Sequence, residues 1–422
     1  MLGSPALAQT VAITGGTVAL GDGSAPIEGG TVVIRDGRIV AAGRGVAVPA
    51  GAQTIDASGK WVAPGFVAGF TRLGLVEVDA ADAANDTSAR RSPYSAAIDV
   101  EPGINPGVTA IAVSRIGGVT RAIVAPSTVN MIFAGQGAVI DTGADANAVT
   151  MPRAFQFVEL GEEGADNAGG SRPAAFVQLR ASLDAAQRYA RNPAGYDGNS
   201  RDALLNHADA AALVPVINGR MPLLVHVEGA NDIRNVLRLR KEFPAVKLVL
   251  VGAAEGWLVA RDIAAAGVPV IASALADLPS SFERVAATQS NIGRMKAAGV
   301  RVSIGMIDDN DAMQARYSPQ YAGNLVALNK IPGATGLQWG EALAAITSGP
   351  ADALGMGNEI GSLRAGRRAD VVLWDGDPLE LSSHAERVWI DGVEQPLVSR
   401  QTKLRDRYAR PQEGELPKTY ER

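Results

Sequence analysis

The chain has 422 residues, of which 47% are hydrophobic and 20% are charged, and its formal net charge is −5. This composition is typical of a globular protein that is long enough for one large domain and one smaller one. The sequence contains no cysteine, which excludes disulfides, thiolate nucleophiles and thiolate metal ligands. It contains no lysine- or arginine-rich block, so its charge gives no reason to expect a nucleic-acid partner.

The first nine residues resemble the end of a signal peptide. Ala6, Leu7 and Ala8 have the small–x–small form of a signal-peptidase site, and Gln9 would begin the mature chain. The basic region and most of the apolar region of such a peptide are absent, and a plain N-terminal extension is the alternative. We interpret residues 1–9 as a signal-peptide remnant and expect a periplasmic protein. No apolar run is long enough to predict a membrane span.

Residues 10–62 alternate between apolar and polar side chains, with turn signals between the alternating runs. Residues 31–35 and 38–42 flank Asp36 and Gly37. An Asp-Gly pair supplies the positive φ angles of a type I′ turn, so this segment predicts a β-hairpin. The whole region is expected to form a small sheet.

The long middle region alternates expected strands with expected helices. Such βα repeats over residues 63–354 predict a closed parallel barrel, although the pattern is also compatible with an open doubly wound sheet. Strands are expected at 121–125, 222–226, 247–251, 268–271 and 300–304, and helices at 180–191, 232–242, 258–266 and 340–347.

The strand pattern returns near the end of the chain, at residues 369–374 and 387–390. Short sheets expose an apolar face that needs a partner, so residues 10–62 and 355–395 are expected to pair into one composite β-sandwich. Residues 396–422 form a polar tail, in which 399–408 are expected to be a surface helix.

Three segments together resemble the amidohydrolase superfamily, in the branch near imidazolonepropionase and related secreted amidohydrolases. They are WVAPGFV at 61–67, ALAAITSGPADALG at 342–355 and GSLRAGRRADVVLWDGDP at 361–378. Residues 126–140, which include Gln136, are similar to a secreted subgroup. The resemblance implies an α/β fold with a (β/α)8 TIM-like barrel and a small β-sandwich. It also implies descent from hydrolases of amide or cyclic amide C–N bonds.

Active members of this superfamily hold divalent metal ions at the carboxyl ends of the barrel strands. The resemblance implies a His-x-His pair on strand 1, further histidines on strands 5 and 6, and an aspartate on strand 8. Residues i and i+2 of a strand face the same side, so two such imidazoles can bind one ion. The metal lowers the pKa of its bound water, and the aspartate accepts the proton.

This sequence departs from that pattern. Phe70 and Arg72 occupy the His-x-His positions, and Gly252 falls at the strand 6 position. Phenylalanine cannot bind a metal, and arginine is a fixed cation that repels one. The strand 5 histidine is present as His226, and the strand 8 aspartate is Asp308 or Asp309. The sequence identifies no bridging ligand after the third strand, where Asp141 ends the segment, so binuclear zinc is not expected.

The remaining polar groups define the candidate site. Arg72 is a candidate to bind a carboxylate or polarise a carbonyl, or else to pair internally with Asp308. His226 and Glu228 should both face inward, as an acid/base pair or as a hydrogen-bonded remnant of an older site. With Asp308 they would form at most one weak zinc or manganese site. Gln136 is a candidate for substrate binding.

The other acidic and histidine residues have simpler interpretations. Residues 308–311 carry four oxygen-bearing side chains in a row, which suits either a hard cation such as calcium or a solvated loop with helix N-cap residues. His207 is expected at the surface or at the edge of the core, and His384 is expected far from the barrel mouth.

Three functions remain open from the sequence. The first is an altered or inactive amidohydrolase homologue that binds a small molecule or peptide, or that supports an active paralogue as a subunit. The resemblance also implies a homo-oligomer as an alternative assembly. The second is a working C–N hydrolase with a mononuclear or metal-free site. The third is an envelope interaction protein. Fold and descent alone do not decide between them.

Overall fold

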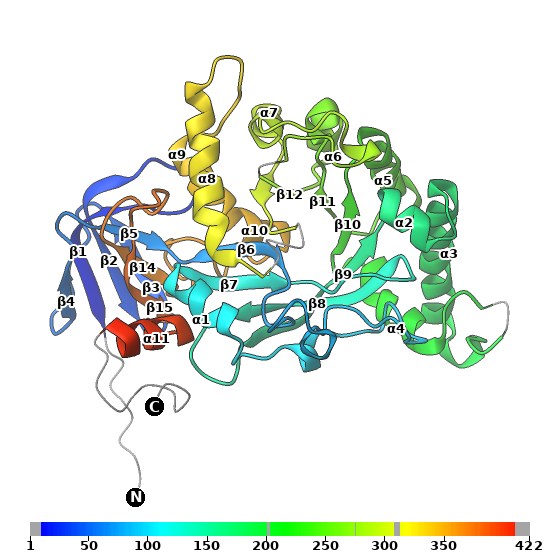
Figure 1. The fold of residues 1–422 in the computed structure, drawn as a ribbon, viewed down its shortest axis with the longest axis horizontal. Helices are drawn as coiled ribbons and strands as arrows, with labels where there is room; N and C mark the ends of the chain where they lie inside the picture. The colour runs from blue at the N-terminus through cyan, green and yellow to red at the C-terminus, as the bar shows by residue number, and fades with distance from the viewer. Residues whose placement is uncertain (1–9, 201–202, 275, 308–312, 410–422) are drawn as a thin grey trace, which may run out of the picture.

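The computed structural model describes residues 10–200, 203–274, 276–307 and 313–409. Two sheets dominate the molecule (Figure 1). A sheet built from both ends of the chain lies on the left of this view, and a closed barrel built from the middle of the chain lies on the right. The proposed signal-peptide remnant, Asp308 to Asp311 and the end of the polar tail lie outside the described residues.

The terminal sheet joins two segments that are far apart in the sequence. Its hydrogen-bonded order is β16-β15-β14-β5-β1-β2-β3, and β4 pairs with β1. This path confirms that the chain ends form one composite β unit. Its strands are β1 Val11–Val18, β2 Ile27–Arg35, β3 Arg38–Gly43, β4 Gln53–Asp56, β5 Trp61–Pro64, β14 Val371–Trp374, β15 Ala385–Ile390 and β16 Val393–Gln395.

The predicted hairpin is confirmed within this sheet. Asp36 and Gly37 have φ angles of 52° and 71°, as a type I′ turn requires, and Arg35 pairs with Arg38 across the turn.

The barrel sheet has the order β13-β12-β11-β10-β9-β8-β7-β6, and a parallel bridge between Gly69 and Gly305 closes it. A closed barrel therefore replaces the open-sheet alternative. Its strands are β6 Phe66–Thr71, β7 Val119–Val124, β8 Phe133–Asp141, β9 Val149–Glu159, β10 Leu223–Val227, β11 Leu248–Gly252, β12 Val270–Ala272 and β13 Val302–Ile304.

One barrel strand departs from the uniform βα repeat that the sequence predicts. Strand β8 runs antiparallel to both β7 and β9, whereas the other strand pairs of the barrel are parallel. Antiparallel neighbours can be joined by short connections, and no crossover helix separates β7, β8 and β9.

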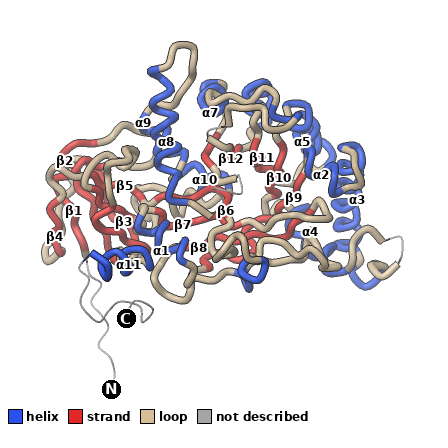
Figure 2. Tube along the Cα trace, in the orientation of Figure 1, coloured by secondary structure: helices blue, strands red, loops and turns tan. Residues whose placement is uncertain are grey.

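Helices cover the outer side of the barrel strands (Figure 2). The segment 342–355 falls on two short helices, α9 and α10. The helices are α1 Thr109–Ile116, α2 Gly161–Asn167, α3 Arg172–Arg191, α4 His207–Ile217, α5 Ala230–Glu242, α6 Ala260–Ala266, α7 Asn291–Ala297, α8 Ser318–Ala327, α9 Trp339–Ala345, α10 Ser348–Ala353 and α11 Arg400–Ala409.

Alternation along the strands decides which side chains reach the barrel interior. On β9, Phe155 and Phe157 belong to the inner apolar core, whereas Val158 belongs to the core beneath the helices. On β10, Leu224 faces inward by the same rule. The strand period therefore turns Glu159 and His226 toward the barrel interior.

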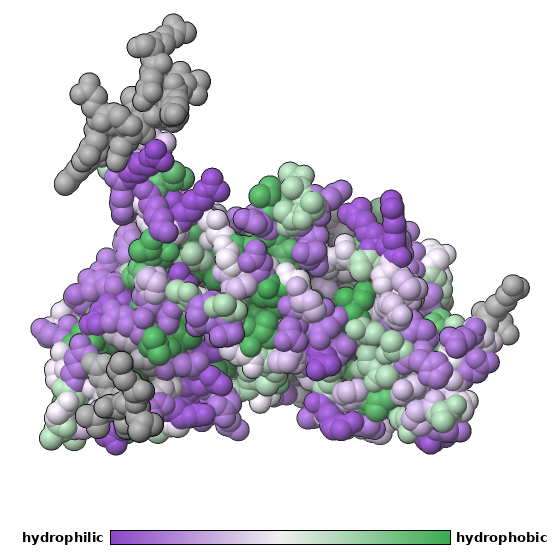
Figure 3. Space-filling view, turned by 90° about the horizontal axis from the view of Figure 1, so that it is seen from below, coloured by the Kyte–Doolittle hydropathy of each residue, from purple (hydrophilic) through white to green (hydrophobic). Residues whose placement is uncertain are grey.

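The described helices include none that is long and apolar enough to cross a membrane. The face of the molecule seen from below intersperses polar and apolar residues (Figure 3).

Candidate functional site

A cavity of about 330 Å³ opens where strands β6, β7, β9 and β10 end. In TIM-like barrels this end of the strands carries the active site. The cavity is lined by polar groups and by a smaller apolar set. The lining residues are Phe70, Arg72, Val76, Asp79, Asn85, Thr87, Ser88, Arg90, Ser127, Thr128, Val129, Phe157, Glu159, Glu163, His226, Ile307 and Met313.

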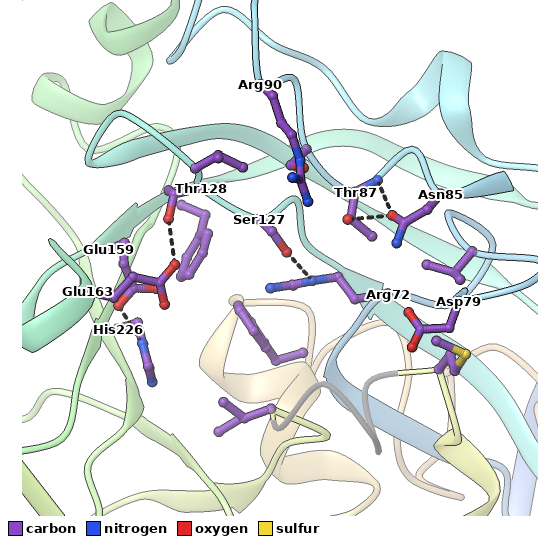
Figure 4. Close-up of a pocket in the computed structure, with 17 residues that line it drawn as sticks. Arg72, Asp79, Asn85, Thr87, Arg90, Ser127, Thr128, Glu159, Glu163 and His226 are labelled. Atoms are coloured by element: carbon purple, nitrogen blue, oxygen red, sulfur yellow. Dashed lines mark hydrogen bonds and ion pairs between the residues drawn. The ribbon is translucent and has the colours of Figure 1, made fainter. Parts of the chain in front are cut away.

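Two groups of side chains lie on opposite sides of this cavity (Figure 4). One contains Arg72, Asp79, Asn85 and Thr87, and the other contains Thr128, Glu159, Glu163 and His226. The side chain of Arg90 extends toward the cavity between them.

Arg72 directly follows β6 and is held there by the segment that follows β7. Its Nε donates to Ser127 Oγ at 2.9 Å, and one Nη donates to the carbonyl oxygen of Ala125 at 2.9 Å. The guanidinium also lies 4.9 Å from the ring centroid of Phe70, a cation–π distance. Phe70 itself has a positive φ of 60°, which is uncommon for a bulky residue.

His226 is enclosed by two carboxylates on the other side of the cavity. Its Nδ1 lies 2.5 Å from Glu159 Oε1, and its Nε2 lies 3.0 Å from Glu228 Oε1. Glu228 also accepts from an Nη of Arg284 at 2.6 Å and from the backbone N–H of Ala254 at 2.7 Å. These groups form one continuous polar chain from β9 to the loop after β12.

The electrostatics of this chain follow from burial and charge. Burial by itself would lower the pKa of His226, but Glu159 and Glu228 outweigh burial and raise that pKa well above its ordinary value. Burial raises the pKa of Glu159 to about 7, against the opposing effect of His226. Burial would also raise the pKa of Glu228, but His226, Arg284 and the Ala254 N–H together lower it.

Gly252 leaves the space that Glu228 occupies. A Cβ atom at Gly252 would lie 2.6 Å from Glu228 Oε1, and Gly252 has a φ of +88°. The carboxylate therefore occupies the position into which a strand 6 side chain would point. This contact gives a steric reason for glycine at a position where the resemblance implies histidine.

The structure brings together only some of the predicted site residues. Arg72 and His226 both line the cavity. Glu228 does not line it, but its carboxylate contacts His226 Nε2. Asp308 and Asp309 lie outside the described residues, so their predicted roles as ligand and proton acceptor stay predictions.

Gln136 lies elsewhere. It is 7% exposed, it is absent from the cavity lining, and its Nε2 lies 3.5 Å from the Ala97 carbonyl oxygen. Gln136 pairs with Gln156, between the inward-facing Phe155 and Phe157, so its side chain lies on the face of the sheet away from the barrel interior. Its predicted role in substrate binding stays a prediction.

Sequence analysis missed Glu159, which ends β9 and contacts His226. The signal was the alternating run AFQFVE at 154–159, which closes with a carboxylate. The two other histidines lie where they were expected. His207 packs edge-on against Tyr189 and Tyr196, and His384 is exposed near Asp375.

Within the described ranges, no group of three or more His, Asp or Glu side chains is placed to hold a metal ion.

The chain is similar to one family model, to one curated protein and to several solved structures. Residues 221–401 match the model of the amidohydrolase family. Amidohydrolase tasK of Hapsidospora irregularis is 26% identical over 385 residues, which cover 82% of this chain and 38% of that protein. The chain thus spans less than half the length of this curated relative.

Among solved structures, an amidohydrolase from Thermotoga maritima superposes with a TM-score of 0.78 at 24% identity, covering 91% of this chain and 99% of that one. Molinate hydrolase superposes with a TM-score of 0.54 at 19% identity, covering 92% and 95%. At these identities the solved structures show the fold.

Proposed function

Since this chain belongs to the amidohydrolase superfamily, we propose that it binds a small carboxylate-bearing molecule at the barrel mouth without a binuclear metal centre. The position of Arg72 carries this proposal. Arg72 directly follows β6, where the resemblance implies a metal-binding histidine, and its side chain lines the cavity. A fixed cation there can supply the positive charge that a metal ion would supply.

The contacts of the described side chains do not suit a binuclear centre. A metal-binding imidazole needs a free ring nitrogen, whereas both ring nitrogens of His226 lie within hydrogen-bonding distance of carboxylates. Phe70 has no donor atom, and the Arg72 guanidinium would repel a divalent ion. We infer that the described residues favour a bound organic anion over two metal ions.

The chemistry of the cavity favours a small carboxylate. A guanidinium binds a carboxylate through two parallel hydrogen bonds, and Arg90 adds a second cation beside Arg72. Phe157 and Ile307 offer apolar surface for the rest of the ligand. A volume of about 330 Å³ lies at the lower end of the range for small-molecule sites.

Calorimetric titration of the protein after dialysis against EDTA tests the proposal, with N-acyl amino acids and dipeptides as the first ligands. We expect the metal-free protein to bind at least one of them. Arg72→Gln should weaken binding at least tenfold, and Arg72→Lys should weaken it less because the charge remains. Arg153→Gln, an exposed arginine outside the cavity lining, is the matched control and should bind normally.

Elemental analysis separates this proposal from the working-hydrolase alternative. Near-stoichiometric zinc or manganese that disappears in His226→Ala, together with hydrolysis that EDTA abolishes, would overturn the proposal. That result would favour a mononuclear hydrolase instead.

A further inference from the structure

A second and larger cavity lies at the opposite end of the barrel. It measures about 550 Å³ and is lined by residues that precede or begin strands β10, β11, β12 and β13, with the end of α10 across it. Parallel strands begin at the same edge of a sheet, so the loops before them converge there. The barrel mouth described above lies where the same strands end.

Four basic residues line this lower cavity, from four separate segments. Arg220 and Lys247 precede β10 and β11, Arg240 lies on α5, and Arg301 precedes β13. Asp352 is the one carboxylate in the lining. A local excess of positive charge in a chain of net charge −5 indicates a site for an anion.

These four basic side chains differ from Arg234, which also lies in the barrel domain, in that they have no carboxylate partner among the described residues. In the described part of the chain, none of the four forms an ion pair with a carboxylate. By contrast, Arg234 on the same helix α5 pairs with Asp262 at 3.2 Å.

The backbone at the end of α6 holds two of the guanidinium groups beside the cavity. Arg240 donates to the carbonyl oxygen of Ala266, and Arg301 donates to that of Gly267. These carbonyls end a helix, where the backbone dipole favours nearby cations. No heavy atom lies within 4 Å of where a Cβ would stand at Gly267 or Gly355, so the cavity wall is open there.

We propose that this lower cavity, lined by Arg220, Arg240, Lys247 and Arg301, binds a small molecule that carries two or more phosphate groups. Cations from four segments surround the cavity and suit a compact ligand with several negative charges. Guanidinium groups bind phosphate oxygens through paired, charge-assisted hydrogen bonds, and a lysine adds a point charge. This site is independent of the ligand proposed for the barrel mouth.

Calorimetric titration with inorganic pyrophosphate tests the proposal. The unmodified protein should bind one pyrophosphate per chain, with an affinity that falls as salt increases. The double variant Arg240→Gln/Arg301→Gln should lose at least tenfold in affinity. Lys247→Gln, whose side chain forms no hydrogen bond or ion pair with the described residues, should lose severalfold while keeping the thermal unfolding midpoint of the parent.

Two matched variants make the result specific to this cavity. Arg234→Gln removes the same charge from the same helix, and Arg72→Gln removes a cation from the barrel mouth. Both should bind pyrophosphate as the parent does. Absence of binding up to millimolar pyrophosphate, or equal losses in Arg234→Gln, would overturn the proposal. Loss of binding in Arg72→Gln would place the anion at the barrel mouth and would equally overturn it.

Discussion

At the scale of single residues, the geometry of the site depends on the close packing of the Glu228 carboxylate against Gly252, at the end of β11. Glu228 is 2% exposed and holds His226, Arg284 and the Ala254 N–H at once. A buried carboxylate is stable only while such donors remain, and its removal takes from each of them a buried hydrogen-bond acceptor.

Replacement of Gly252 by alanine tests this packing. The new Cβ would lie 2.6 Å from Glu228 Oε1, and the φ of +88° disfavours any side chain. We expect Gly252→Ala to lower the free energy of unfolding by about 2–4 kcal/mol, measured by urea denaturation. Gly267→Ala is the control, because its φ is +62° but no atom lies within 4 Å. Equal losses in both variants would show that backbone conformation, not the contact with Glu228, is responsible.

Removal of the Glu228 carboxylate should cost more than removal of a surface carboxylate. We expect Glu228→Ala to lower the free energy of unfolding by about 3–5 kcal/mol, because the Ala254 N–H, His226 and Arg284 all lose the buried carboxylate that they contact. Glu242 forms an exposed ion pair with Arg180, so Glu242→Ala should cost less than about 1 kcal/mol. Urea denaturation of both variants compares them, and a similar small loss in each would contradict the structural role of Glu228.

At the scale of elements, one buried arginine joins the barrel to the terminal sheet. Arg121 on β7 is 1% exposed, and its Nε lies 2.8 Å from Asp370 Oδ2, just before β14. Its guanidinium also lies 2.8 Å from Asp391, after β15, and 3.5 Å from Asp141, at the end of β8. Four strands therefore share one charged cluster.

The cluster makes the effect of an Arg121 substitution depend on pH. Burial would raise the pKa of Asp391, but Arg121 and Arg368 lower it, so this group stabilises the fold above its unfolded pKa of about 3.9. That contribution is lost as the pH falls through the lower folded pKa. Burial raises the pKa of Asp141, and Arg121 limits that rise. Without Arg121, the folded-state pKa values of both aspartates should be higher.

We therefore expect Arg121→Gln to destabilise the protein most at neutral pH and progressively less below about pH 4. Urea denaturation of parent and variant from pH 7 to pH 3 measures the difference. A penalty that is constant over this range would show that Arg121 acts through packing alone. Arg234→Gln, which removes an exposed ion pair, is the charge-matched control and should cost little at any pH.

At the scale of the whole molecule, the two sheets are too closely connected to unfold separately. Gly65 is the single residue between β5 of the terminal sheet and β6 of the barrel. Phe66 of the barrel packs on Trp374 of the terminal sheet, with ring centroids 5.4 Å apart. The Arg121 cluster adds charged contacts across the same junction.

We expect urea to unfold the molecule in one cooperative transition. Tryptophan fluorescence of a Trp257→Phe variant reports on the remaining four tryptophans, three of which lie in β5, β14 and β15. Far-UV circular dichroism reports mainly on the helices around the barrel. The two midpoints should coincide. A fluorescence change at lower urea than the dichroism change would show that the terminal sheet unfolds by itself.

Local patterns in the sequence determined much of this protein. Alternation with Asp36-Gly37 between two runs specifies a hairpin, because the turn needs positive φ angles and the strand period is two. The repeated βα units and the closing segment at 361–378 led to the barrel, to the pairing of the chain ends and to the family. The spacing of His226 and Glu228 predicted that both face the same way, because His226 lies on β10 and Glu228 directly follows that strand.

Tertiary structure alone decided the rest, because it depends on contacts between distant residues. The register between β8 and β9 put Gln136 opposite Gln156, on the face away from the barrel interior, and the local sequence does not specify that register. Glu159 became a partner of His226 only when β9 and β10 paired in register. The lower cavity arose in the same way, since its four cations come from three loops and helix α5, which only the closed barrel brings together.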